Sequence, residues 1–393
     1  MNKKLLEIKA EILQILDLMV KNLGSVKYVF LAVIILHILL GAFISPLFSS
    51  DFERNIFYGE AFWEHGFQVY DLTPLEIDPN YSIGDPTSGI LAYENTTYDY
   101  PTIQLLFWAG MVLLPFPQIT IKWVLSFFDV LNCIMLFLLL KRYSPEESSN
   151  SQMKDFEKIF LIGYLLFSIP FSAIEGQSTS ITIFFLFLPL VLYNYKQYAS
   201  YLTIGLGFHW KYVSFLILPY ILCRDYKHWK KAIIGIAVLI STIVLFSFPL
   251  IWSNFILAFF GFFGNLSSYS GQTPSNPLLL TELYLSSIIS SGILLLGIFF
   301  WLKPISGESE ISFGIRGLIQ RGYWLPLLML LSFLKIYATA FPWYWLWFYP
   351  LLAILPEKER RVFTLLFVVT FAIGIIDFIH MTVGFETFIG YIT

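Results

Sequence analysis

The chain has 393 residues, of which 57% are hydrophobic and only 13% are charged. Soluble domains carry about 25% charged residues, so this composition excludes an ordinary water-soluble protein and indicates an integral membrane protein. The net charge of −3 argues against a nucleic-acid partner, and the two cysteines suggest neither a disulfide framework nor a metal cluster.

The first 26 residues have the pattern of an amphipathic helix. Leu5, Ile8, Ile12 and Leu16 recur at helical spacing among lysines and glutamates. Such a helix lies on a membrane surface, here the cytoplasmic one, and its pattern is not that of a typical signal peptide.

Apolar runs near the ~20 residues that a bilayer requires follow along the chain. They predict an all-α polytopic protein of about 10–12 transmembrane helices, built as one membrane domain over residues 1–393. The runs lie at 29–48, 101–117, 119–140, 158–174, 178–195, 200–222, 232–250, 283–302, 323–338, 342–355 and 362–380.

Two of these runs allow a second topology. Residues 101–117 are short and end at Pro115-Phe116-Pro117, so a re-entrant segment is the alternative to a span. Residues 200–222 contain Lys211, and a break there would move Glu175 and Gln177 from the cytoplasmic side to the outside.

The charges orient the chain. Segment 49–100 is rich in Asp and Glu and holds a single Arg, Arg54, which predicts a large first extracytoplasmic loop with short helices. A second external loop is expected at 251–282. Lysines and arginines near residues 3–9, 224–231 and 358–361 predict the cytoplasmic side.

Asp51 directly follows the first predicted span and opens a run that predicts a helix stopping at Gly66. Helical spacing puts Asp51, Arg54 and Tyr58 on one side of this helix. A carboxylate between an apolar wall and water suits a general base that takes a proton from a sugar hydroxyl. The alternative is that Asp51 caps the helix.

Lys211 lies inside a predicted span, where an ionisable side chain is costly and is therefore a functional candidate. A cationic group can pair with a phosphate, and this role is expected of Lys211 and Arg54. The alternatives are that Lys211 reaches to the interface or forms a structural ion pair, and that Arg54 only holds the carboxylate of nearby Asp51.

Several motifs occur in a fixed order over about residues 30–355. They are Asp51 after the first helix, Tyr98-Asp99-Tyr100-Pro101 at the next helix, Glu175-Gly176-Gln177, the segment from Gly205 to Lys211, and the aromatic segment from Phe341 to Trp347. The ordered set resembles the GT-C membrane glycosyltransferases, most closely glycosyltransferase family 87. The mannosyltransferase that adds the first mannose of GPI anchors is a more distant likeness.

The resemblance implies a multi-pass enzyme of the cell membrane with its active site on the extracytoplasmic side. Such an enzyme moves a hexose, mannose above all, from a polyprenyl-phosphate donor to a lipid-linked or glycan acceptor. By this likeness Asp51 is the catalytic base, the anomeric carbon is inverted and the polyprenyl phosphate leaves. No cofactor is expected, and a metal requirement stays open.

Further side chains are candidates for substrate binding. Each also has a structural interpretation, such as a helix cap, a loop residue or an interfacial aromatic belt. They are Tyr58, Asp99, Tyr100, Glu175, Gln177, His209, Trp210 and Tyr344.

Two other functions compete with transfer. One is a secondary transporter, although the two halves of the chain do not match in hydropathy and the acidic loop occurs once. The other is a non-catalytic membrane component of envelope glycan export.

Overall fold

The computed structural model describes residues 3–44, 50–83, 97–143, 153–193, 195–225, 228–250, 346–355, 360–361, 364–365 and 368. These residues form helices and connecting segments without a strand, which confirms the predicted all-α class. The second predicted loop, 251–282, and the predicted spans at 283–302 and 323–338 lie outside the described residues.

Three described helices are long and apolar enough to cross a membrane. They are Pro117–Arg142, Asp155–Ile174 and Trp229–Leu250, and a fourth arises if Lys9–Leu23 and Lys27–Phe43, bent by 119° at their junction, count as one span. These helices support a membrane protein of the predicted all-helical kind.

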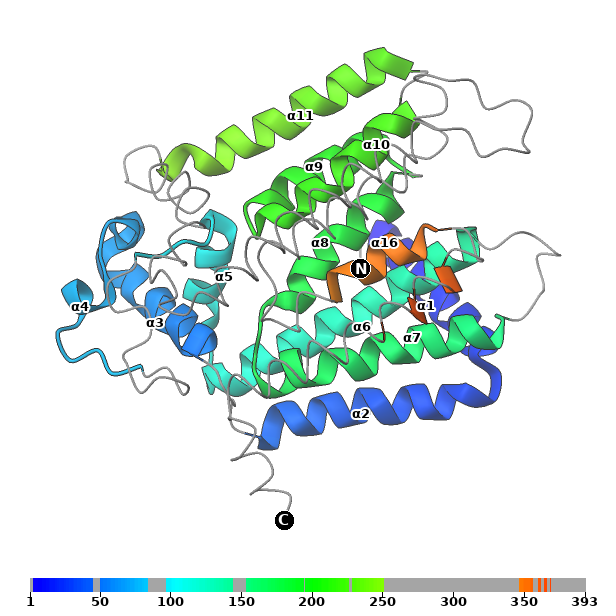
Figure 1. The fold of residues 1–393 in the computed structure, drawn as a ribbon, viewed down its shortest axis with the longest axis horizontal. Coiled ribbons are helices and arrows are strands. Elements are labelled where there is room, and N and C mark those ends of the chain that lie inside the picture. Colours follow the sequence, from blue (N-terminus) through cyan, green and yellow to red (C-terminus); the bar gives the residue numbers. More distant parts are fainter. Residues whose placement is uncertain are drawn as a thin grey trace, which may run out of the picture.

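One layer of the bundle is formed by three helices that lie side by side (Figure 1). They are α2 (Lys27–Phe43), α6 (Pro117–Tyr143) and α7 (Asp155–Ser168). α7 continues into the π-helix η3 (Ile169–Ile174). The predicted N-terminal helix is α1 (Lys3–Leu23), which precedes α2.

A second group of helices packs on α6. α8 (Thr179–Leu192) contacts α6 and α9 (Gln197–Phe208), and α9 in turn contacts α11 (Trp229–Ser247). α9 and α11 approach closely because Gly205 has no side chain, since a Cβ there would lie 2.8 Å from Cβ of Thr242.

The expectation of one continuous span over 200–222 is wrong. α9 ends at Phe208, and the chain continues as η4 (Tyr212–Ile217) and α10 (Leu218–Asp225), with Lys211 in the break. η4 folds back on α9, because the Ser214 hydroxyl donates to the Ile204 carbonyl at 3.0 Å. The 12 residues of α9 extend about 18 Å, which is less than the thickness of the hydrocarbon core. The alternative of a segment broken near Lys211 is therefore confirmed.

The segment 101–117 also differs from a single span. Its helix is α5 (Thr102–Met111), which has 10 residues and reaches only about 15 Å. Pro101 precedes this helix as its N-cap. α6 then begins at Pro117. The alternative given for 101–117, a re-entrant segment that does not cross the bilayer, fits this geometry.

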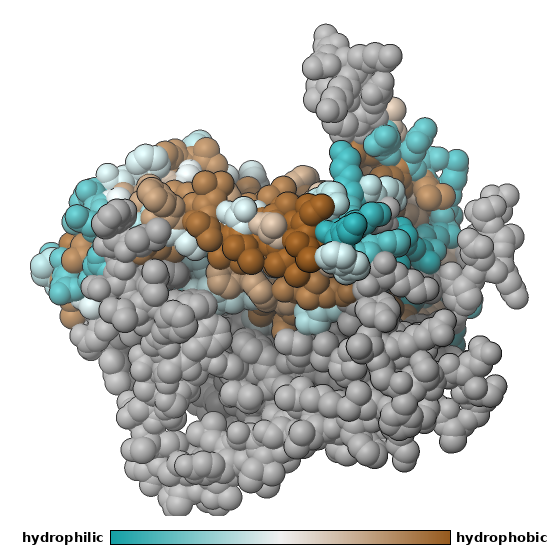
Figure 2. Space-filling model, turned by 90° about the horizontal axis from the view of Figure 1, so that it is seen from above, coloured by the Kyte–Doolittle hydropathy of each residue, from teal (hydrophilic) through white to brown (hydrophobic). Residues whose placement is uncertain are grey.

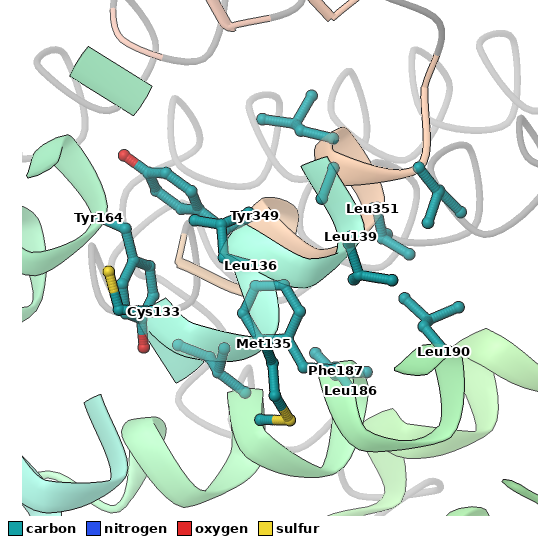
Figure 3. Close-up of a cluster of buried hydrophobic side chains, with 14 of the residues drawn as sticks. Cys133, Met135, Leu136, Leu139, Tyr164, Leu186, Phe187, Leu190, Tyr349 and Leu351 are labelled. Atoms are coloured by element: carbon teal, nitrogen blue, oxygen red, sulfur yellow. The ribbon is translucent and has the colours of Figure 1, made fainter. Parts of the chain in front are cut away.

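The core lies where α6, α7 and α8 meet the late helix α16 (Phe348–Ala353). Figure 3 shows aliphatic side chains of α6 and α8 together with the rings of Tyr164 and Tyr349. Those two rings lie edge to face, with centroids 5.1 Å apart. Burial of this apolar surface holds the late segment against the first half of the chain.

On the face seen in Figure 2, hydrophobic residues form a band with hydrophilic residues at its two ends. α11 exposes a row of aliphatic side chains: Ile233, Ile234, Ile240, Val244 and Leu245. Its first turn carries Lys230 and Lys231. An exposed apolar band with charges at its ends is typical of a protein surrounded by lipid.

Candidate functional site

The first loop folds against one end of the bundle, where α3 (Ser50–His65) packs on α5. The two helices touch at Gly59, where a Cβ would lie 2.8 Å from the backbone of Trp108. α3 ends before Gly66, whose φ of +57° suits a glycine, so the predicted helix stop is confirmed. The 3₁₀ segment η2 (Gly66–Tyr70) follows.

Three other elements converge on the start of α5. The Ile103 N–H donates to the His209 carbonyl at 3.0 Å, and the Thr102 hydroxyl donates to the Phe246 carbonyl at 2.9 Å. The Gln104 amide donates to Ser178 at 3.4 Å. The ends of α9 and α11 and the start of α8 therefore meet the start of α5, directly after the first loop. We call this region, around residues 102–104 and the adjoining α3, the loop end.

Arg54 is buried at the loop end and holds Asp99. Its Nη1 lies 3.0 Å from an oxygen of Asp99, and its Nη2 donates to the Thr97 carbonyl at 2.9 Å. The guanidinium also lies over the rings of Tyr58 and Tyr98, at 5.7 and 5.8 Å from their centroids. Arg54 thus holds the carboxylate of Asp99, whereas the alternative interpretation expected it to hold Asp51.

The turn after η3 brings Glu175 next to Asp51. Gly176 adopts φ +71°, and a Cβ there would lie 2.4 Å from Cδ2 of Phe52. This glycine therefore packs directly against the residue that follows Asp51. Burial, and secondarily the charge of Asp51, raises the pKa of the Glu175 carboxyl to about 8. The alternative topology, with Glu175 on the same side as Asp51, is supported.

Lys211 lies in the break between α9 and η4, between two aromatic rings. Its Nζ is 5.4 Å from the centroid of Tyr100 and 5.3 Å from that of Trp347. Burial lowers the pKa of Lys211 to about 8, while the charges of Asp51 and Asp99 act in the opposite direction. Lys211 is thus within electrostatic reach of both acids of the first loop.

Other predicted residues have structural partners. The Tyr58 hydroxyl donates to the Leu72 carbonyl at 3.3 Å. His209 Nε2 lies 2.9 Å from the Ile243 carbonyl, and Trp210 donates to the Thr182 hydroxyl at 3.2 Å. Gln177 is buried in the turn after Glu175. Tyr344 lies outside the described residues.

A second polar cluster, which we call the Asp129 node, was missed in the sequence. Asp129 is fully buried in the middle of α6. Its Oδ1 accepts a hydrogen bond from Tyr164 at 2.9 Å, and its Oδ2 accepts one from the Ser172 hydroxyl and lies 3.7 Å from His37 Nε2. An acidic residue inside a predicted span was the signal that could have found it.

Comparisons with known proteins found no match to this chain among family models, curated proteins or solved structures. Among the described residues, no group of three or more His, Cys, Asp or Glu side chains could hold a metal ion. The residues of the loop end are therefore the evidence for its chemistry.

Proposed function

We propose that the chain is a polytopic membrane glycosyltransferase with the GT-C type of fold and about 10–12 transmembrane helices. It transfers a hexose, with mannose as the first candidate, from a polyprenyl-phosphate donor to a lipid-linked or glycan acceptor outside the cytoplasm. The observation that carries the proposal is that Lys211 lies against the end of the first loop, 160 positions after Asp51: its Nζ is 5.4 Å from the ring of Tyr100, which directly follows Asp99, and the charges of Asp51 and Asp99 act on it.

The two side chains suit the two ends of the transfer. Asp51 takes the proton of the acceptor hydroxyl, whose oxygen attacks the anomeric carbon from the face opposite the phosphate. The bond from that carbon to the phosphate oxygen breaks, and its electron pair leaves with the polyprenyl phosphate. Lys211 stabilises the charge that develops on the phosphate.

The surroundings of Lys211 support this role. The rings of Tyr100 and Trp347 flank the ammonium and limit its contact with water. A partly desolvated cation binds phosphate more strongly than an exposed one. Arg54, paired with Asp99, positions the loop rather than the phosphate in this mechanism.

The charges support an external loop end. The loop end carries Asp51 and Asp99 besides Arg54 and Lys211, whereas α6 ends at the opposite side with only basic residues, Lys141 and Arg142. The rule that basic residues stay in the cytoplasm favours an orientation with the loop end outside.

The experiment is a transfer assay on membranes that contain the wild-type chain or Asp51→Asn. The membranes are incubated with radiolabelled polyprenyl-phosphate hexoses, and labelled lipid or glycan products are separated. We expect a product with the wild type only. Equal product from Asp51→Asn would overturn the assignment, and no product with any hexose donor would overturn the transferase.

A secondary transporter remains the second candidate, because the Asp129 node contains an acid and a histidine inside candidate spans. A transporter would lose function with Asp129→Asn and keep it with Asp51→Asn. The transferase reverses this order.

A further inference from the structure

Two carboxyl groups from separate elements meet at the loop end, and they differ in their surroundings. Asp51 is partly exposed in the first turn of α3, whereas only 7% of Glu175 is exposed. Oε2 of Glu175 has no hydrogen-bond partner among the described residues. A buried carboxyl without a partner is costly when ionised, so its position needs an explanation.

The backbone fixes Glu175 in this position. Its N–H donates to the Pro170 carbonyl at 3.0 Å, and the Gln177 N–H donates to the Phe171 carbonyl at 2.7 Å. The Gly176 backbone lies against the Phe52 ring. The backbone of the turn is thus held on both sides of Glu175, and its Cα is fixed near the start of α3.

The charges at the loop end favour the neutral form of Glu175. The charge that acts on Glu175 is that of Asp51 on α3. Arg54 pairs with Asp99, and Lys211 is attracted to Asp51 and Asp99. A proton on Glu175 avoids a second negative charge beside Asp51.

We propose that Glu175 acts as an uncharged carboxylic acid that binds a hydroxyl group of the donor sugar beside Asp51. Its O–H donates to the sugar oxygen, and its carbonyl oxygen accepts from a sugar O–H. This inference rests on the proposed transfer reaction and names the residue that holds the sugar while Lys211 holds the phosphate.

The chemistry distinguishes the two acids. A neutral carboxylic acid both donates and accepts, which matches a hydroxyl group, and it does not repel the anionic phosphate nearby. Two carboxyl groups whose environments separate their protonation states divide the work, one as the base and the other as a donor. Burial keeps the proton on Glu175 at neutral pH, consistent with its raised pKa.

The first test is infrared difference spectroscopy of the purified full chain at pH 7, which detects the carbonyl band of a protonated carboxyl group. We expect a band that disappears in Glu175→Gln and persists in the control Glu60→Gln, which removes an exposed acid on α3. A short-chain prenyl-phosphate hexose should shift the band, and the same prenyl phosphate without sugar should not. The inference is overturned if the band is absent, or if its position does not change when the sugar is added.

The second test is the transfer rate. Glutamine keeps a donor and an acceptor, so Glu175→Gln should remain within about threefold of the wild type, while Glu175→Ala should lose about tenfold, as expected for lost hydrogen bonds. Equal losses in both variants would mean that the carboxylate is required and would overturn the inference.

The two tests separate the inference from the proposed function. If the wild type transfers no hexose but the sugar shifts the Glu175 band, the reaction is wrong and the sugar contact holds. If transfer depends on Asp51 but the band is independent of Glu175, the reaction holds and the inference fails.

Discussion

Two regions of the molecule bury acidic side chains, and they do so in opposite ways. In the Asp129 node, both carboxylate oxygens face donors, which come from Tyr164 of α7 and Ser172 of η3, with His37 of α2 close by. At the loop end, Glu175 is nearly as buried but has an oxygen without a hydrogen-bond partner among the described residues.

The difference separates a residue that holds helices together from one that is ready for a ligand. A buried polar group whose hydrogen bonds are made within the protein stabilises that arrangement. One whose hydrogen bonds are not made costs stability, and a bound molecule can supply the missing partner. Ser172 and Glu175 are only three residues apart, so the node also anchors the π-helix that leads to the loop end.

The largest effect is expected at Asp51. Asp51→Asn should lower the transfer rate by about 10²–10⁴-fold, the contribution of a general base, with an unchanged melting temperature. Glu53→Gln, which changes an exposed acid on the same helix, is the control and should keep full activity. A melting temperature that falls with activity would indicate that Asp51 only caps α3.

A substitution in the Asp129 node should change the stability of the protein rather than the chemistry of transfer. Asp129→Ala leaves the hydroxyls of Tyr164 and Ser172 without their acceptor, so we expect a loss of about 3 kcal/mol in the free energy of unfolding. The measurement is denaturant unfolding of the detergent-solubilised protein. Glu175→Ala should leave this free energy unchanged or higher, and an equal loss in both variants would remove the distinction between the regions.

The turn that carries Glu175 should be sensitive to a single methyl group. Gly176→Ala adds a Cβ that meets the Phe52 ring at a positive φ, so we expect it to cost about 2 kcal/mol or more and to reduce transfer. Gly66→Ala is the matched control, because its φ is +57° but no atom lies within 4 Å of the new Cβ. Equal costs would show that backbone strain alone, not packing on α3, decides.

Lys211 should affect the reaction of the donor. Lys211→Met removes the cation that stabilises the charge developing on the phosphate, so kcat/KM for the polyprenyl-phosphate donor should fall about tenfold. Lys158→Met, which removes a lysine paired with Asp155 on α7, is the control and should leave kcat/KM unchanged. An unchanged kcat/KM in Lys211→Met would mean that Lys211 forms only a structural ion pair.

The sequence proposed site residues most directly where a single residue carries its own signal. Asp51 follows an apolar run and Lys211 interrupts one, and each could be identified without knowing its neighbours. Glu175 was a candidate only under one of two topologies. Its burial depends on Gly176 and Phe52, which are more than 120 positions apart, so no local pattern revealed it.

The helix boundaries illustrate the same limit. Hydropathy predicted α6 and α11 well, because long apolar runs favour a helix wherever they lie. It joined α9 to η4 across Lys211, because the run 200–222 as a whole is apolar on average. The break exists because Ser214 bonds back to Ile204 and because the His209 carbonyl accepts from α5.

By itself the sequence determined the all-helical class and the acidic character of the first loop, because composition and hydropathy need no partner to act. Only the tertiary structure decided which polar groups meet. In the folded protein Arg54 pairs with Asp99, and Glu175 lies beside Asp51. Hydrogen bonds and charges act over a few ångströms, and those distances exist only after distant segments have packed together.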